Sequence, residues 1–519
     1  MTRLRHRIPV SLRQNWKLLV AGAAFLGVCW GVFGGGMVRP YAVSVSSTSA
    51  DTVTQDVTGT KDLFDTSVPH EITLTFRDES YQDMLAEYAK DGEKKYVEAD
   101  LTIDGTTVPS VGIRLKGNST LRGLTWQGQR VTQGRGVPGG ERPEGPPGGR
   151  ARPEGRQPPD GFNPPEGFQP PDGFRPPGEA DQQTGDQQDG RQGRRRGGPG
   201  GPGGFGGLGA ELKAEEPESL PWLISFDEFV DGRRYQGHSQ IAVRPVTGQS
   251  SAMLNEALAI ATVGAAGEPT QSYTYSAFTV NGRASAPRLV VEYLDEGYAA
   301  DLGDGVLYKS LATGSFTYKG EDQTRYGDDF KQVNQVGGTD LQPVINLVRW
   351  VNETSDEEFA AGLSARLDVE SFARYAALQH LMLNFDDMSG PGRNYYLWYD
   401  LGTRRFRVIT WDLNFAYNGD ASTGPHDSVG GFGGGMMGGH KLKERFLETP
   451  AFKKLYEEQY AALYRELLAG GTLTGLLGAL VRSYELNDGA APVDSEAERL
   501  RTLLTERARA LSADEVITR

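Results

Sequence analysis

The sequence predicts a mixed α+β domain that follows one N-terminal transmembrane helix. Short segments with alternating apolar and polar residues, typical of half-buried strands, recur in the first half of the chain, as at residues 72–76 and 108–115. Longer segments with helical periodicity fill the C-terminal part, as at residues 451–468 and 495–511. An uncharged apolar run at residues 18–38 is long enough to cross a bilayer as one helix.

Positive charge precedes the apolar run and predicts its orientation. The N-terminus is expected in the cytoplasm and the main domain outside, so we expect a single-pass protein of the cytoplasmic membrane. Because the run is long for a signal peptide, a retained signal anchor is the first interpretation; cleavage after Ala50 and lipidation at Cys29 are the alternatives. Cys29 is the single cysteine, which excludes disulfides and cysteine chemistry from the external part. The basic residues before the run are Arg3, Arg5, Arg7, Arg13 and Lys17.

Composition divides the chain into a tail, the anchor, a stalk and one interrupted domain. Residues 1–17 form the basic cytoplasmic tail, and the Ser/Thr/Val-rich residues 39–66 predict a flexible stalk. The main domain is expected over residues 67–519. Residues 127–218 interrupt it with a Pro/Gly-rich segment in which a Pro-Pro-Asp/Glu-Gly-Phe unit recurs, so we expect a disordered insertion. This insertion is either a neutral tether or a segment that recruits envelope partners through its phenylalanines.

Charge and metal-ligand content narrow the function classes. A net charge of −14 argues against a nucleic-acid partner. No spacing of histidine or cysteine suits zinc. Aspartate and asparagine side chains instead suit a hard cation, Mg²⁺ or Mn²⁺, with Ca²⁺ as an alternative.

Residues 383–416 are the stretch around which the predicted chemistry is organised. A polar loop with Asp386 and Asp387 follows an apolar helix. Two strand-like runs, at residues 394–399 and 406–411, are joined by a short turn and predict a β-hairpin.

A hairpin returns the chain to its start, so Asp412 after the second strand should lie near Asp386 and Asn394. Two carboxylates and the amide groups of Asn394 and Asn414 would then meet at one end of a small sheet. Phosphoryl transfer uses such a set: one carboxylate takes the proton of the attacking hydroxyl, and the other groups hold a divalent ion. The competing interpretation is a solvated loop with a strand-capping aspartate, since Asp and Asn are common at turns.

Three motifs in this region resemble the CotH family of spore-coat-type atypical protein kinases. They are Asn-Phe-Asp at 384–386, Arg-Asn-Tyr-Tyr-Leu-Trp-Tyr at 393–399 and Thr-Trp-Asp-Leu-Asn at 410–414. The resemblance covers roughly residues 70–470 apart from the insertion. Further matching stretches precede these motifs in the family's order, at residues 114–120, 226–237, 280–282, 291–292 and 307–309.

The resemblance implies an atypical protein-kinase-like fold, with a mixed or antiparallel sheet lobe and a helical C-terminal lobe, that uses ATP with Mg²⁺ or Mn²⁺. It implies Asp386 as the catalytic base, with Asp387 as the alternative. It implies Asp412 as the main metal ligand, Asn394 as the second, and Asn414 beside them. The groups expected to bind the nucleotide are Lys116, Asn118, Glu292 and Lys309, with Glu292 and Lys309 as the lysine–glutamate pair that anchors phosphates.

Two positions depart from the family's pattern. Relatives usually carry a lysine where this chain has Leu223, and an arginine where it has Asn255, just before Glu256. If that lysine binds phosphate, Lys116 and Lys309 are the candidates to replace it. Without the family context, the turn after Lys116 and an ion pair made by Lys309 are as consistent with ordinary surface structure.

The resemblance implies a membrane-anchored, extracytoplasmic protein kinase that transfers the γ-phosphoryl group of ATP to Ser or Thr of envelope or coat proteins. One alternative is a catalytically inactive relative that acts as a scaffold for envelope or coat assembly, which the leucine at position 223 favours. Another is a surface adhesin in which the acidic cluster binds calcium structurally. Nucleotide binding would count against the scaffold, and metal-dependent stability without a nucleotide effect would favour the adhesin.

Overall fold

The computed structural model describes residues 53–117, 120–131, 211–245, 252–336, 338–429, 439–487 and 493–519. The predicted tail, the apolar run and residues 39–52 of the stalk lie outside these residues, as do Asn118 and residues 132–210 of the insertion. In the described ranges, no helix has the length and apolar character needed to cross a membrane.

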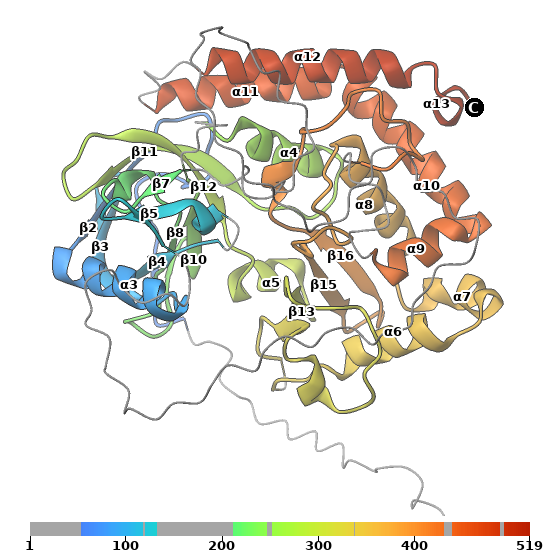
Figure 1. Cartoon of the computed structure of the whole chain (residues 1–519), viewed down its shortest axis with the longest axis horizontal. Helices are drawn as coiled ribbons and strands as arrows, with labels where there is room; N and C mark the ends of the chain where they lie inside the picture. The colour runs from blue at the N-terminus through green and yellow to red at the C-terminus, as the bar shows by residue number, and fades with distance from the viewer. Residues whose placement is uncertain are drawn as a thin grey trace, which may run out of the picture.

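Seven strands close into a barrel in the order β10-β12-β11-β2-β3-β4-β8 (Figure 1). Neighbouring strands are antiparallel except β2 and β11, which run parallel. Helix α3 (Asp78–Asp91) contacts β3, and its buried side chains join the apolar cluster inside the barrel. The strand bounds are β2 Glu71–Phe76, β3 Val97–Ile103, β4 Thr106–Leu115, β8 Trp222–Ser225, β10 Gln240–Val243, β11 Tyr273–Val280 and β12 Ala286–Glu292.

One row of side chains points out of the barrel toward the rest of the molecule. Arg114 on β4 pairs with Leu223 on β8, which pairs with Ala242 on β10, which pairs with Val291 on β12. Their neighbours along each strand belong to the apolar cluster inside the barrel. Because side chains alternate along a strand, these four residues face outward, and two of them, Ala242 and Val291, line the cavity described below.

The second sheet contains the predicted hairpin. Strand β15 (Tyr395–Asp400) pairs antiparallel with β16 (Phe406–Thr410), from Tyr395↔Thr410 to Tyr399↔Phe406, which confirms the hairpin. The sheet continues through β13 (Gly305–Ser310) to β14 (Phe330–Gln332), both antiparallel to their neighbours. The hairpin is therefore one edge of a four-stranded sheet.

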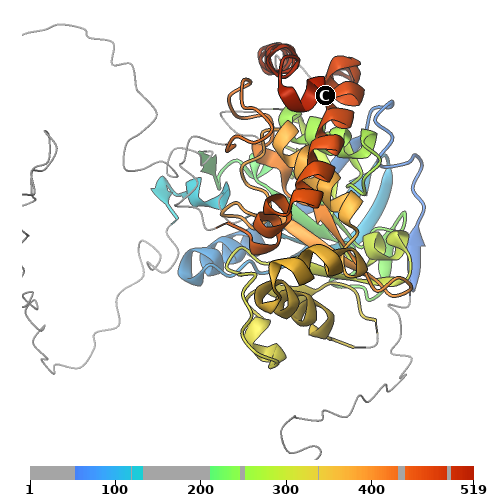
Figure 2. The same ribbon diagram turned by 90° about the vertical axis from the view of Figure 1, so that its right-hand side faces the viewer.

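Helices cover this second sheet and form the largest apolar core with it. Figure 2 shows the C-terminal helices lying together along one side of the molecule. Helix α10 continues as a π-helical turn over Tyr464–Ala469. The α-helices are α4 Leu254–Ala265, α5 Glu296–Leu302, α6 Gln342–Glu353, α7 Asp356–Gly362, α8 Val369–Leu381, α9 Lys441–Glu448, α10 Pro450–Leu463, α11 Thr472–Leu486, α12 Asp494–Leu511 and α13 Glu515–Thr518.

Two predicted boundaries need correction because short strands form inside segments expected to be flexible. Within the predicted stalk, β1 (Gln55–Val57) pairs parallel with β9 (Arg233–Tyr235). At the two ends of the predicted insertion, β6 (Gln129–Arg130) and β7 (Leu212–Lys213) flank β5 (Leu124–Trp126) in a small sheet. Strands of two or three residues are too short to give an alternating pattern, and their pairing is long-range. The Ser/Thr/Val-rich and Pro/Gly-rich compositions of these segments therefore predicted flexibility throughout.

The start of α7 lies one residue later than expected. The sequence suggests a capping box from Thr354 to Glu357, but the structure forms it from Ser355 to Glu358. The Ser355 hydroxyl accepts from Glu358 N at 3.2 Å, and Glu358 Oε2 accepts from Ser355 N at 3.3 Å. Adjacent Thr and Ser both suit the cap, so the sequence left this register open.

Candidate active site

A cavity with an empty volume of about 190 Å³ lies between the outer face of the barrel, helix α4 and the end of β16. Four of its residues are charged, and they come from four separate segments of the chain. Its lining residues are Lys116, Ala242, Arg244, Glu256, Gln271, Val291, Trp411 and Asp412.

Arg244 joins the two acidic residues of the cavity. Its Nε lies 2.7 Å from Glu256 Oε2 and its Nη2 lies 2.8 Å from Asp412 Oδ1. The side chains of Arg244 and Glu256 are buried, at 8% and 3% exposure. Burial alone would lower the pKa of Arg244, but Glu256 and Asp412 raise it. Sequence reasoning missed this residue, since one arginine after a strand matches no motif and only its place beyond β10 could have drawn attention to it.

Asp412 follows β16 in a left-handed backbone conformation, with φ of 52°. A non-glycine residue is rarely found there, and such strain concentrates at functional sites. Burial would raise the pKa of the Asp412 carboxyl, but Arg244, Lys116 and Lys309 lower it below its ordinary value. Asp412 is therefore ionised at neutral pH.

The two predicted phosphate-binding lysines both lie over the Trp411 ring. The Nζ atoms of Lys116 and Lys309 are 5.1 Å and 5.0 Å from its centroid. Burial and Arg244 lower the pKa of Lys116 to about 7, against the opposing charges of Asp412 and Glu256. Lys309 also donates to the Tyr293 hydroxyl at 3.1 Å. The structure thus brings both lysines to Trp411, the residue before Asp412, and of the two, Lys116 lines the cavity.

The expected pairing of Glu292 with Lys309 is wrong. Glu292 Oε1 lies 3.3 Å from His238 Nδ1, and its Oε2 accepts from Ser272 N at 2.8 Å. The reason is strand alternation: Val291 faces the cavity, so Glu292 points to the other side of β12. The glutamate that pairs with a cation in the cavity is Glu256.

Asp386 and Asn394 are held together in the loop between α8 and β15. Asn394 Nδ2 donates to the main-chain carbonyl and to Oδ2 of Asp386, both at 3.0 Å. Gly392 N donates to the other carboxylate oxygen at 2.6 Å. Burial, assisted by the charges of Asp412 and Asp387, raises the pKa of Asp386 to about 6. The influence of Asp412 on this pKa shows that the hairpin brings the two carboxylates within electrostatic reach.

Asp387 points toward the helical part of the molecule. Its Oδ2 forms an ion pair with Lys443 of α9, and its Oδ1 accepts from Ser389 N at 2.8 Å. Both carboxylates are bonded on both oxygens, but the donors to Asp386 are neutral amide groups, whereas Asp387 is paired with a cation. This difference favours Asp386 over Asp387 as a group able to accept a proton.

The amide groups predicted as metal ligands present oxygen atoms that fit this role. Because Asn394 uses its Nδ2 on Asp386, its Oδ1 is turned away from that residue. Asn414, in the 3₁₀ turn Leu413–Phe415, has a buried Oδ1 with no hydrogen-bond partner among the described residues. One carboxylate and two amide oxygens are the donor set of a hard cation, so Asp412, Asn394 and Asn414 fit Mg²⁺ or Mn²⁺.

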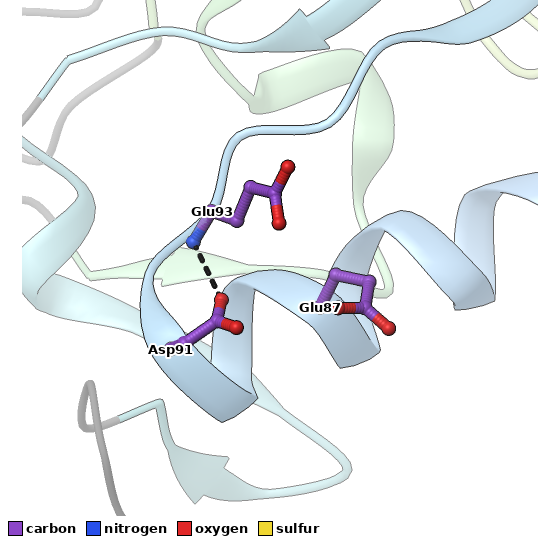
Figure 3. Close-up of side chains that lie close together, drawn as sticks. All are labelled: Glu87, Asp91 and Glu93. Atoms are coloured by element: carbon purple, nitrogen blue, oxygen red, sulfur yellow. Dashed lines mark hydrogen bonds between the residues drawn. The ribbon is translucent and has the colours of Figure 1, made fainter.

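A second acidic group lies elsewhere, at the end of α3 (Figure 3). The carboxylate oxygens of Glu87, Asp91 and Glu93 lie within 4.8 Å of one another. Asp91 accepts from Glu93 N at 3.0 Å, and Lys90 pairs with Glu87 at 3.4 Å. These are exposed or half-buried side chains with local partners, and we assign no ion to them.

The two departures from the family pattern both lie beside the cavity. Leu223 is buried in the outward row next to Ala242, so a lysine there would point toward the cavity wall. Asn255 donates through Nδ2 to the main-chain carbonyl of Asn414 at 2.6 Å. Arg244 supplies the cation that pairs with Glu256, so the cavity keeps its positive charge despite Leu223.

Comparisons with known proteins bear on this arrangement. Residues 215–485 match the family described as CotH kinase protein. No curated protein was found to match the chain. Among solved structures, the complex of Shewanella oneidensis MR-1 toxin–antitoxin HipA and HipB with operator DNA is similar at 12% identity and a TM-score of 0.26. That similarity covers 54% of this chain and 60% of that one, and it is too low to support an argument. On the family match, the chain belongs to the CotH kinase protein family.

Proposed function

We propose that the protein is an atypical protein kinase that transfers the γ-phosphoryl group of ATP to Ser or Thr of envelope or coat proteins. The observation that carries this proposal is the convergence of Asp412, Arg244, Glu256 and Lys116 on one cavity, with Asp386 bonded to Asn394 at the start of the hairpin that ends in Asp412. Family membership makes ATP and a divalent ion the expected cofactors. The chemistry of the residues then assigns each a role.

Lys116 and Arg244 provide the positive charge for the phosphates. The cavity's charged lining consists of two cations and two carboxylates, so without these cations an anionic nucleotide would be repelled. Arg244 presents a planar fork that suits phosphate oxygens, and Glu256 holds this fork in place at 2.7 Å. Lys309 adds a further charge over Trp411.

Asp386 is the proposed general base. A base must be ionised and near the reacting proton, and a pKa of about 6 leaves Asp386 ionised at neutral pH yet more basic than an ordinary aspartate. It would accept the proton of the attacking Ser or Thr hydroxyl on a carboxylate oxygen. Gly392 N and Asn394 Nδ2 fix the orientation of that carboxylate.

Asp412, Asn394 and Asn414 are the residues that would hold Mg²⁺ or Mn²⁺. When bound, the ion supplies positive charge that offsets the charge of the transferred phosphoryl group. Arg244 occupies one oxygen of Asp412, at 2.8 Å.

An inactive scaffold is the second candidate, and the cavity itself favours it. The space in it that a water-sized molecule can enter is far below the roughly 300–1,000 Å³ of ordinary ligand pockets. The contact between Arg244 and Asp412 also places a cation against the proposed metal ligand. Catalysis therefore requires Arg244 to exchange Asp412 for phosphate oxygens, while its pair with Glu256 stays.

The proposed location is the outer face of the cytoplasmic membrane, with residues 18–38 as the anchor. The support is the charge distribution around the apolar run in the sequence. In this proposal the anchor helix alone attaches the protein to the membrane. The acceptor of the phosphoryl group is an envelope or coat protein.

The experiment that separates the two candidates uses the full-length protein in detergent. Wild type and Asp412→Ala are incubated with γ-labelled ATP and Mg²⁺ or Mn²⁺, and label entering protein is followed beside the nucleotide-dependent melting shift. Transfer by wild type and none by Asp412→Ala supports the kinase. No transfer and no melting shift for wild type would support the scaffold instead.

A further inference from the structure

Helix α12 lies outside the residues that match the family, yet it contacts three parts of the candidate site. The match ends at residue 485, and α12 spans Asp494–Leu511. Figure 1 shows it running along the edge of the molecule beside α11, above α4. Its buried polar side chains face inward, and each one binds main-chain groups next to a residue of the site.

Glu496 near the start of α12 caps the N-terminus of α4. Its Oε1 accepts from Leu254 N at 2.9 Å, and its Oε2 lies 3.4 Å from Ala252 N. The N-cap residue of α4, Met253, provides no side-chain cap and has φ of 50°. A carboxylate at a helix N-terminus satisfies free amide groups and complements the helix dipole. Glu496 therefore supplies the cap that α4 lacks.

The capped turn of α4 carries Glu256. Leu254 is the first residue of α4, so Glu256 lies in the same turn as the amide that Glu496 binds. The main chain just before this turn is fixed a second time, because the Tyr275 hydroxyl donates to Ala252 O at 2.7 Å. A shift of this turn would move Glu256 and with it Arg244, which Glu256 holds at 2.7 Å.

Arg507 near the end of α12 caps the C-terminus of α8. Its guanidinium is fully buried and donates to Leu381 O at 2.7 Å and His380 O at 3.0 Å. These carbonyls belong to the last two residues of the helix, and a cation there complements the dipole. The His380 carbonyl also accepts from Leu383 N at 3.0 Å. The chain then passes through Leu383, with φ of 54°, to Asp386.

The same arginine also holds the segment beyond the hairpin. It donates to Ala421 O at 3.2 Å and to Thr423 O at 3.0 Å. Between the two caps, Arg499 Nη1 donates to Tyr417 O at 3.2 Å, five residues after Asp412. One helix therefore fixes the main chain on both sides of the Asp386–Asp412 hairpin.

We propose that α12 is part of the catalytic unit, with Glu496 and Arg507 as positioning residues for Glu256 and for the Asp386 loop. The two residues are separated by three helical turns, roughly 16 Å along the axis, so a single rigid helix sets the spacing between the two halves of the site. This inference rests on the proposed phosphoryl transfer and extends the functional unit beyond the matched residues.

The test uses the full-length protein with Glu496→Ala, Glu496→Gln, Arg507→Met and Arg507→Lys. Glu496→Ala should raise the KM for ATP about tenfold with a smaller change in kcat, because it acts through Glu256 and Arg244. Arg507→Met should lower kcat about tenfold with a smaller change in KM, because it acts through the Asp386 loop. The conservative variants keep part of each cap and should recover part of each loss.

The matched control is Arg501→Ala on the same helix. Arg501 is 44% exposed and, among the residues that the structure describes, its side chain pairs only with Glu498, so its loss should leave kcat and KM near wild type. A double-mutant cycle between Glu496 and Glu256 distinguishes a positioning role from a general loss of stability. If Glu496 acts through Glu256, Glu496→Ala should worsen Glu256→Gln by less than about twofold. Fully additive losses, or folded variants with wild-type kinetics, would overturn the proposal.

Hydrogen exchange separates this inference from the proposed function. Glu496→Gln and Arg507→Lys should speed exchange at amides 254–256 and 383–387, respectively, while the rest of the protein keeps its protection. If wild type transfers no phosphoryl group but these local changes appear, the kinase proposal fails and the positioning role of α12 stands. Unchanged exchange at both places would overturn the role of α12 whatever the activity.

Discussion

Arg244 Nη2 lies 2.8 Å from Asp412 Oδ1, which joins the end of a barrel strand to the end of the hairpin in the second sheet. This contact spans the two parts of the molecule that form the cavity. Since the other end of the Arg244 guanidinium is held by Glu256, the arginine is the residue through which α4, the barrel and the hairpin are connected.

Replacing Arg244 should lower both the activity and the stability of the protein. Arg244→Met leaves Glu256 buried without its cation, and removing one partner of a buried ion pair is strongly destabilising, by about 3 kcal/mol or more. We expect kcat/KM for ATP to fall about a hundredfold and the melting temperature to fall, with Arg244→Lys intermediate. Arg349→Ala is the control, because its pair with Glu321 is nearly half exposed. Wild-type kinetics in Arg244→Met would remove Arg244 from the site.

The rate of transfer should depend on pH through Asp386. Its pKa is raised to about 6, and a general base works only when ionised. The rate at saturating ATP should therefore be constant above about pH 7 and fall about tenfold per unit below about pH 6. Measuring kcat at saturating ATP from acid to neutral pH checks this. An acid limb near the ordinary aspartate pKa of about 4 would show that another group is the base.

The Asp386 carboxyl should affect stability in the opposite sense: the transfer rate rises with pH, whereas the contribution of this group to folding falls. An aspartate whose pKa is higher in the folded than in the unfolded protein stabilises the fold while protonated, and this contribution is lost as pH rises through the folded pKa. The unfolding free energy of wild type relative to Asp386→Asn should therefore fall between about pH 4 and about pH 7, by up to about 3 kcal/mol. Urea unfolding of both proteins at the two pH values measures it. A difference that is independent of pH would contradict the raised pKa.

Lys116 should lose its charge near neutral pH. Its pKa is lowered to about 7 by burial and by Arg244, so the neutral amine appears above that pH. Amine-reactive labelling at about pH 8 should modify Lys116 ahead of ordinary lysines, and ATP with Mg²⁺ should protect it. The KM for ATP should also rise above about pH 7 in wild type but not in Lys116→Arg, whose charge is permanent. Labelling of Lys116 that nucleotide does not slow would place it outside the binding site.

The local sequence pattern was sufficient to predict the hairpin. The β15–β16 pairing was confirmed because both strands are bounded by turn residues. Closure of the barrel was not predictable in this way. It depends on pairings such as β2 with β11, between segments about two hundred residues apart, which leave no periodic signal.

In the candidate site, too, residues close in sequence were predictable and residues that act over long sequence distances were not. Asp386, Asn394 and Asp412 were found because one hairpin brings them together within a short stretch. Arg244, Glu496 and Arg507 were missed because each acts alone on a distant segment. Glu292 was assigned wrongly because β12 has buried side chains on both faces, so its apolar pattern does not reveal which face meets the cavity.

The most direct test compares Asp386→Asn with Asp387→Asn in the same transfer assay, with nucleotide binding measured in parallel. The proposal predicts that Asp386→Asn still binds ATP but transfers at least about a hundredfold more slowly, since removing a general base removes chemistry and not binding. Asp387→Asn should lose stability through its Lys443 pair and retain much more transfer than Asp386→Asn. Equal transfer by wild type and Asp386→Asn would contradict the assignment of this loop as the catalytic centre.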